Sequence, residues 1–144
     1  MPEKGKKLKV RYKGVGDMPY KVVIADKVDL IRDIYENAIE QSEGYTMAAS
    51  FGKPAQAVAY LTNNSADIVV MNLVSDAGIN GIEAAERIKA LKPEVKVIVT
   101  VILSKAEDIA QAQKAGVDGL WTVRADEKAF LDVMCRVMAG EKIF

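Results

Sequence analysis

The chain has 144 residues, of which 50% are apolar and 28% are charged, and its formal net charge is zero. These values predict one globular domain with a hydrophobic core and exclude a disordered protein. The single cysteine, Cys135, excludes an internal disulfide and a cysteine-cluster metal site, and the absence of histidine removes the commonest proton shuttle and metal ligand.

Charge is distributed unevenly along the chain. Residues 1–18 carry six basic residues against two acidic ones, whereas the remainder carries 14 Lys and Arg against 18 acids. We expect a flexible basic arm over 1–18, which could contact nucleic acid or an acidic partner but is more commonly a solvated tail, and a folded domain over 19–144. Because no apolar run approaches a membrane span and no signal peptide is evident, we expect a cytoplasmic protein without membrane contact.

Apolar segments alternate with helical patterns along the rest of the chain. In chain order, strands are expected at Tyr20–Asp26, Tyr45–Ser50, Ile68–Leu73, Val95–Ile102 and Val117–Val123. The intervening helices have recognisable start and stop residues: Gly44 as a stop, Pro54 as a start, Asn80 with Glu83 and Ser104 with Glu107 as capping boxes, Gly116 as a stop, Asp126 as a cap and Gly140 as a stop.

The alternation of strands and helices predicts a three-layer α/β fold, in which a doubly wound parallel sheet has helices on both faces. Ligands of such folds gather beyond the carboxyl ends of the strands. Asn72, near the end of the central apolar strand, therefore lies where chemistry is expected.

Three motifs resemble the receiver domain of response regulators over Tyr20 to Phe144. They are Ile24-Ala25-Asp26 before a helix, Asn80-Gly81-Ile82-Glu83-Ala84 at a helix start, and Lys114-Ala115-Gly116-Val117-Asp118-Gly119 before the last strand. The tail Val137–Phe144 is similar to the receivers of NarL/FixJ-type (LuxR-family) transcription regulators. The resemblance implies a flavodoxin-like (CheY-like) fold with five parallel strands in the order 2-1-3-4-5.

The receiver pattern has an acid pair for magnesium, a phosphoacceptor aspartate, a Ser or Thr, an aromatic switch residue and a lysine. When this pattern is transferred to the chain, almost every position holds a residue of a different chemical type. The matching residues are Asp26 and Lys27 for the acidic pocket, Asn72 for the phosphoacceptor, Val101 for the Ser/Thr, Leu120 for the aromatic switch and Val123 for the lysine.

Two neighbours of these positions leave alternatives open. Thr100 and Arg124 each lie one residue from an expected switch position, but a one-residue slip in a strand turns a side chain to the opposite face, so Thr100 would need a bulge to reach the site. Lys27 either pairs with Asp26 or points to solvent. Asn72 either forms a hydrogen bond with one of these two residues or meets the hydrogen-bonding needs of the strand end.

The loop after Asn72 also allows two interpretations. Ser75 and Asp76 are displaced phosphoacceptors or, far more commonly, residues that shape a turn.

The interrupted pattern indicates a pseudo-receiver that is not an enzyme, needs no cofactor, and binds Mg²⁺ poorly. We expect it to regulate an attached or partner output, such as transcription, through protein contacts. Leu120, Trp121 and the helix of Phe130 and Met134 are either core or part of an association surface.

A homodimer would use the face of the fourth helix, fifth strand and fifth helix, or that of the first and fifth helices. DNA contact would need a helix-turn-helix domain absent from this chain. The alternative is a small-molecule or cofactor-binding or enzymatic domain on the same fold, although neither the dinucleotide glycine fingerprint nor a P-loop is present.

Overall fold

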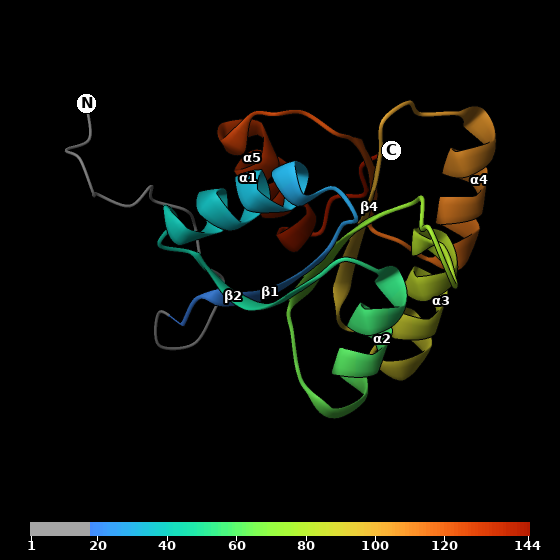
Figure 1. The fold of residues 1–144 in the computed structure, drawn as a ribbon, viewed down its shortest axis with the longest axis horizontal. Coiled ribbons are helices and arrows are strands. Elements are labelled where there is room, and N and C mark those ends of the chain that lie inside the picture. The colour runs from blue at the N-terminus through green and yellow to red at the C-terminus, as the bar shows by residue number, and fades with distance from the viewer. Residues whose placement is uncertain (1–17) are drawn as a thin grey trace.

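The computed structural model describes residues 18–144, so the basic arm expected over 1–18 lies, apart from Met18, outside the described residues. Five strands alternate with five helices in this range (Figure 1). The strands are β1 (Tyr20–Ala25), β2 (Tyr45–Phe51), β3 (Ile68–Asn72), β4 (Lys96–Val101) and β5 (Gly119–Thr122). The helices are α1 (Asp29–Glu40), α2 (Pro54–Asn63), α3 (Gly81–Leu91), α4 (Ala106–Ala115) and α5 (Glu127–Met138).

All neighbouring strands pair in parallel, in the order β2-β1-β3-β4-β5. This confirms the predicted doubly wound sheet and the flavodoxin-like strand order. β1 from Val22 onward and β3 up to Met71 are buried, because helices cover both faces of the sheet. No helix within residues 18–144 is long and apolar enough to cross a membrane.

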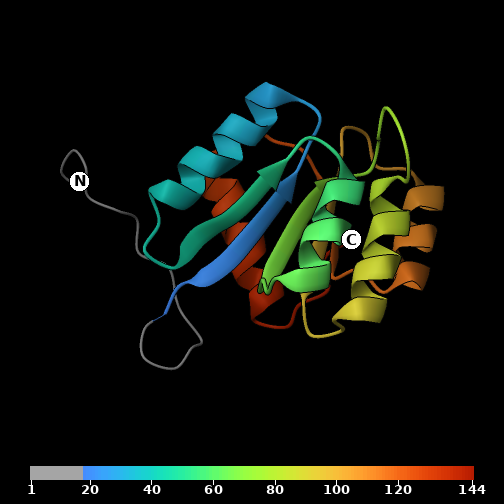
Figure 2. The same ribbon diagram turned by 60° about the horizontal axis from the view of Figure 1, so that its bottom comes forward.

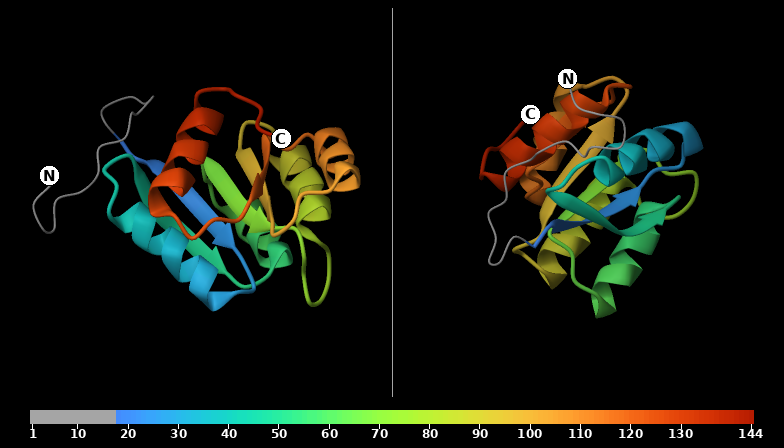
Figure 3. Two further views of the ribbon diagram at one scale, coloured as in Figure 1. Left: turned by 90° about the horizontal axis from the view of Figure 1, so that it is seen from above. Right: turned by 90° about the vertical axis from the view of Figure 1, so that its left-hand side faces the viewer.

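Successive residues along each strand contribute alternately to two hydrophobic clusters, one on each face of the sheet. Helices α2, α3 and α4 cover one face, and α1 and α5 cover the other (Figures 2 and 3). Val23, Val69 and Val99 belong to the first cluster, whereas Ile24 and Val70 belong to the second. The period-two alternation of side chains along a strand therefore decides which helix layer each residue contacts.

Two of the three predicted helix caps are present. The Asn80 side chain accepts the Glu83 backbone N–H at 2.9 Å and Glu83 accepts the Asn80 N–H at 3.1 Å, while Asp126 caps α5. The capping box predicted at Ser104 is wrong. Helix α4 begins one residue later, with Lys105 at its N-cap and no side-chain capping bond. Glu107 therefore stands too early in the helix to reach back, and it accepts a hydrogen bond from Gln111 instead.

The residues weighed as an association surface lie mainly in the core. Leu120, Phe130 and Met134 are buried, and Trp121 is partly buried with its ring 6.1 Å from that of Phe130. Tyr35 of α1 stacks on Phe130 at 4.2 Å between ring centroids. Trp121, Phe130 and Met134 pack with Tyr35 between α1, α5 and β5, whereas Leu120 belongs to the cluster on the other face of the sheet. A partner surface formed by these elements therefore has to use other residues.

Candidate functional site

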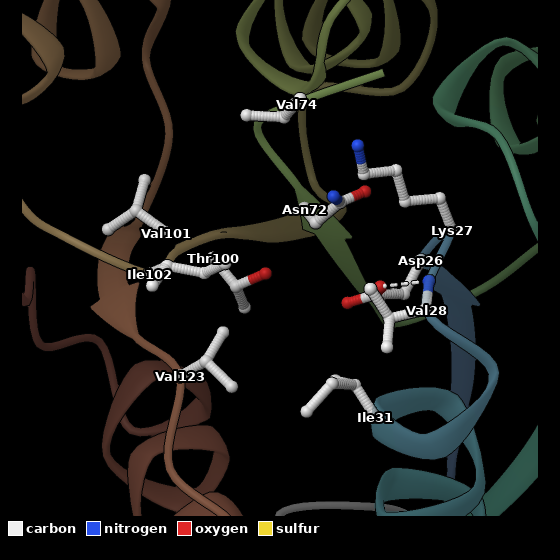
Figure 4. Close-up of a pocket in the computed structure, with 10 residues that line it drawn as sticks. All are labelled: Asp26, Lys27, Val28, Ile31, Asn72, Val74, Thr100, Val101, Ile102 and Val123. Carbon is white, nitrogen blue, oxygen red and sulfur yellow. Dashed lines mark hydrogen bonds between the residues drawn. The ribbon is translucent and has the colours of Figure 1, made fainter. Parts of the chain in front are cut away.

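The carboxyl ends of β1, β3 and β4 and the segment after β5 surround one pocket of about 340 Å³. Crossovers in a parallel sheet bring these strand ends to the same edge, where ligand sites of such folds are found. Figure 4 shows its side chains converging from these segments and from α1. The lining residues are Asp26, Lys27, Val28, Ile31, Asn72, Val74, Thr100, Val101, Ile102 and Val123.

Asp26 directly follows β1 and is only 3% exposed. Its Oδ1 accepts the backbone N–H of Val28 at 2.9 Å (Figure 4). Burial raises the pKa of Asp26, although the Val28 N–H and the positive charges of Arg32 and Lys27 oppose this rise. Within residues 18–144, no cationic group lies within ion-pair distance of this carboxylate.

Lys27 reaches away from Asp26. Its Nζ pairs with Asp76 Oδ1 at 3.0 Å, so it does not form the ion pair with Asp26. Both residues of this pair are exposed, so Lys27 lies at the solvent-facing side of the loop. Ser75 Oγ donates to the Ala77 carbonyl at 2.8 Å, as expected of a residue that shapes a turn. The loop after β3 thus contributes an acid that neutralises Lys27.

Asn72 ends β3 and lines the pocket. Its side-chain Oδ1 is buried without a hydrogen-bond partner among residues 18–144, so this oxygen accepts no bond from Lys27 and pairs with no group at the strand end. A buried acceptor without a partner costs roughly 1–3 kcal/mol, which makes this position a place where a ligand atom or water would be favoured.

Thr100 reaches the pocket without any bulge, so the prediction that it needs one is wrong. It pairs with Asn72 in a continuous β3–β4 register, and directly paired residues of parallel strands share one face of the sheet. Thr100 is 1% exposed, and its hydroxyl donates to the Met71 carbonyl over 3.5 Å. In Figure 4 the Thr100 hydroxyl and the Asp26 carboxylate point toward each other across the pocket.

The other predicted switch positions divide between the pocket and its surroundings. Val101, at the end of β4, and Val123, just after β5, both line the pocket. Leu120 pairs with Val99 and belongs to the cluster under α2, α3 and α4, so it is not a lining residue. Arg124 is exposed and does not line the pocket either.

A sequence profile of the response regulator receiver domain matches residues 22–133. The chain belongs to the response regulator receiver family. Among the curated proteins similar to this receiver is response regulator protein VraR of Staphylococcus aureus, 23% identical over 127 residues. The match covers 88% of this receiver and 60% of VraR, so the chain spans less than two thirds of the length of such relatives.

Solved structures share the fold of this receiver at low sequence identity. A LuxR-family two-component response regulator from Aurantimonas sp. SI85-9A1 has a TM-score of 0.79 at 23% identity, covering 88% of this chain and 90% of that one. The signal receiver domain of the putative response regulator NarL from Mycobacterium tuberculosis also has a TM-score of 0.79, at 15% identity, and covers 85% and 98%.

The pocket of this receiver does not fit the magnesium ion of the family pattern. Mg²⁺ requires several oxygen ligands in octahedral geometry, usually including one or two carboxylates. Of the residues that the structure describes, Asp26 is the only carboxylate that lines the pocket, and the adjacent residue is Lys27. Among residues 18–144, no group of three or more Asp, Glu, His or Cys side chains is arranged to hold a metal.

Sequence reasoning missed the apolar wall of the pocket. Val28, Ile31, Val74 and Ile102 join the two valines that were expected there. Ile102 and Leu103 are 85% and 71% exposed, which is unusual for adjacent large apolar side chains. The sequence feature that could have predicted this wall is the run Val101-Ile102-Leu103, which continues the apolar β4 segment past the end of the sheet.

Proposed function

We propose that this chain is a pseudo-receiver, a signalling domain that does not run the phosphoryl cycle. The observation that carries the proposal is Asn72 at the phosphoacceptor position of a receiver fold. A neutral amide does not attack phosphorus as a carboxylate does. Val101 and Val123 replace the hydroxyl and the ammonium that would stabilise charge on the transferred group.

Thr100 is the feature that most favours a working site, because its hydroxyl lies at the same pocket. A hydroxyl alone does not supply a nucleophile, a metal site or a cation. The proposal therefore holds that the domain has no enzymatic step and uses no magnesium. It controls an attached or partner output, such as transcription, by protein contacts, and DNA contact belongs to a separate helix-turn-helix domain.

Phosphorylation is tested directly by incubating the protein with Mg²⁺ and acetyl phosphate and measuring its intact mass. We expect no phosphoryl adduct, because no carboxylate occupies position 72. A receiver with a complete site serves as the positive control for the reagent. An adduct mapped to residues 72–76 would overturn the proposal.

Homodimerisation stays part of the proposal, through either the α4–β5–α5 face or the α1–α5 face. Since Phe130 and Met134 are buried, contacts on the first face would come from other residues of these elements.

A further inference from the structure

The pocket has a polar floor made of three oxygen-bearing side chains with incomplete hydrogen bonding. Asn72 Oδ1 has no partner among residues 18–144, and Thr100 makes only a 3.5 Å bond. Asp26 accepts one backbone N–H through Oδ1 and has no ion-pair partner in the same range. Such a floor presents acceptors to whatever enters the pocket.

The walls above this floor are aliphatic. They consist of Val28, Ile31, Val74, Val101, Ile102 and Val123. A volume of about 340 Å³ lies at the small end of the range of roughly 300–1,000 Å³ typical of small-molecule sites. Apolar walls with a few convergent polar groups are the usual composition of such a site.

The charges around the pocket determine whether it favours a positively or a negatively charged ligand. Lys27 could have neutralised Asp26 from within, but its ammonium is committed to Asp76 at 3.0 Å. These three residues together carry one excess negative charge, which attracts a cation in a partly desolvated pocket. Arg32 also lies close, since it donates to the Asp26 backbone carbonyl at 2.7 Å, but its guanidinium pairs with Asp29 and this second pair leaves the net charge unchanged. Burial raises the pKa of Asp26 although Arg32 and Lys27 oppose the rise, and a cationic ligand on the carboxylate would lower it.

We propose that the pocket binds a small organic amine, with its ammonium on Asp26 and its apolar body between the valines and Ile31. An ammonium has three N–H donors, which match the acceptors of Asp26, Asn72 and Thr100. The inference rests on the proposed function to the extent that a phosphoryl group and a magnesium ion in the pocket would compete with such a ligand.

Three probes of similar size and different charge test the proposal on the unaltered chain: 2-phenylethylamine, neutral 2-phenylethanol and anionic 3-phenylpropanoate. Binding is followed by calorimetry and by NMR of valine methyl groups. We expect saturable binding of the amine at about millimolar Kd or tighter, at least about tenfold stronger than that of the other two. Shifts should concentrate on Val101 and Val123.

Two variants locate the binding. Asp26→Asn removes the charge at nearly constant shape and should weaken amine binding at least about tenfold. Val123→Phe fills the pocket from a partly exposed position and should abolish it. The matched controls are Asp33→Asn, an exposed acid on α1, and Leu91→Phe, an exposed residue at the end of α3, and both should bind as the native chain does.

Absence of saturable amine binding to the native chain, or tighter binding of the alcohol or the anion, would overturn the inference. Amine binding that survives both Asp26→Asn and Val123→Phe would overturn it as well. The comparison of probes needs no variant, so it decides the matter even if a variant fails to fold. A phosphoryl adduct in the mass experiment, together with amine binding, would refute the proposed function and leave this site standing.

Discussion

At the scale of single residues, the site is distinguished by which functional groups its polar side chains carry. Asp26 keeps the acid of a receiver, but Asn72 supplies an amide and Lys27 is turned to Asp76. Thr100 adds a hydroxyl that the alignment with the family assigned to the neighbouring Val101. Repair of the site therefore requires several groups at once.

Asn72→Asp alone should not restore phosphorylation by acetyl phosphate. The fourfold variant Asn72→Asp, Lys27→Asp, Val101→Thr and Val123→Lys should react at least about 100-fold faster, because each missing electrostatic contact is worth a few kcal/mol in the transition state. These contributions need not be additive. Intact mass over time and binding of beryllofluoride provide the measurement.

A threefold variant that keeps Val101 is the matched control for this experiment. If it reacts as fast as the fourfold variant, Thr100 supplies the hydroxyl. Should the single change Asn72→Asp react as fast as the fourfold variant, the assignment of Val101 and Val123 to the switch positions would be wrong.

At the scale of elements, the start of α3 is packed directly against the end of β3. The Gly81 N–H donates to the Leu73 carbonyl at 2.9 Å, and a Cβ on Gly81 would meet the backbone carbonyl of Asn72. The glycine in the Asn80-Gly81-Ile82 motif is thus required by close approach of two backbones, since Gly81 is not among the positive-φ glycines. The same contact holds the segment that carries Asn72.

Gly81→Ala should destabilise the domain by about 2 kcal/mol or more, because a backbone atom, unlike a long side chain, has little freedom to move aside. Urea unfolding gives the free energy of unfolding, with the slope checked for constancy. Gly52→Ala is the control, since among the described residues its Cβ would come within 4 Å of the Arg32 side chain alone, at 3.6 Å. Equal stability of the two variants would contradict the proposed clash.

At the scale of the whole molecule, a buried carboxylate near the amino edge of the sheet joins four segments. Asp118 is 2% exposed and accepts from Lys142 at 2.6 Å, from the Val97 N–H at 2.8 Å, and from Lys89 at 2.7 Å. Burial raises the pKa of Asp118, but these hydrogen bonds outweigh that effect and lower it below its ordinary value. The Ile143 N–H also donates to the Asp118 carbonyl, so the C-terminal segment is attached here.

Asp118→Asn should destabilise the molecule by about 3 kcal/mol at neutral pH, because it leaves the largely buried Lys89 ammonium without a counter-charge, while the more exposed Lys142 loses less. Since the native pKa is lowered, the stabilisation is present above the unfolded-state pKa of about 3.9 and is lost as the pH falls through the native pKa. Stability of the native chain should therefore decline in that acidic window more steeply than stability of the variant.

Thermal and urea unfolding between neutral pH and about pH 3 measure this difference. Asp132→Asn, which changes an exposed acid on α5, is the control and should follow the native curve closely. Parallel pH curves for the native chain and Asp118→Asn would show that Asp118 does not carry the acid sensitivity.

The sequence by itself determined the fold, because its information is local and periodic. The buried runs of β1, β3 and β4, the Asn80 cap and the stop at Gly116 each depend on a few neighbouring residues, and short strand–helix connections leave little choice of topology. It also placed Asp26, Lys27, Asn72, Val101 and Val123 around one pocket.

Only the tertiary structure decided how these groups are partnered and what surrounds them. The pairing of Lys27 with Asp76, 49 residues apart in sequence, and the register of Asn72 with Thr100 depend on contacts between distant segments. The apolar wall of Val28, Ile31, Val74 and Ile102 likewise forms only where three segments converge. Local patterns do not carry this information, because a side chain's partner is set by the packing of whole elements against one another.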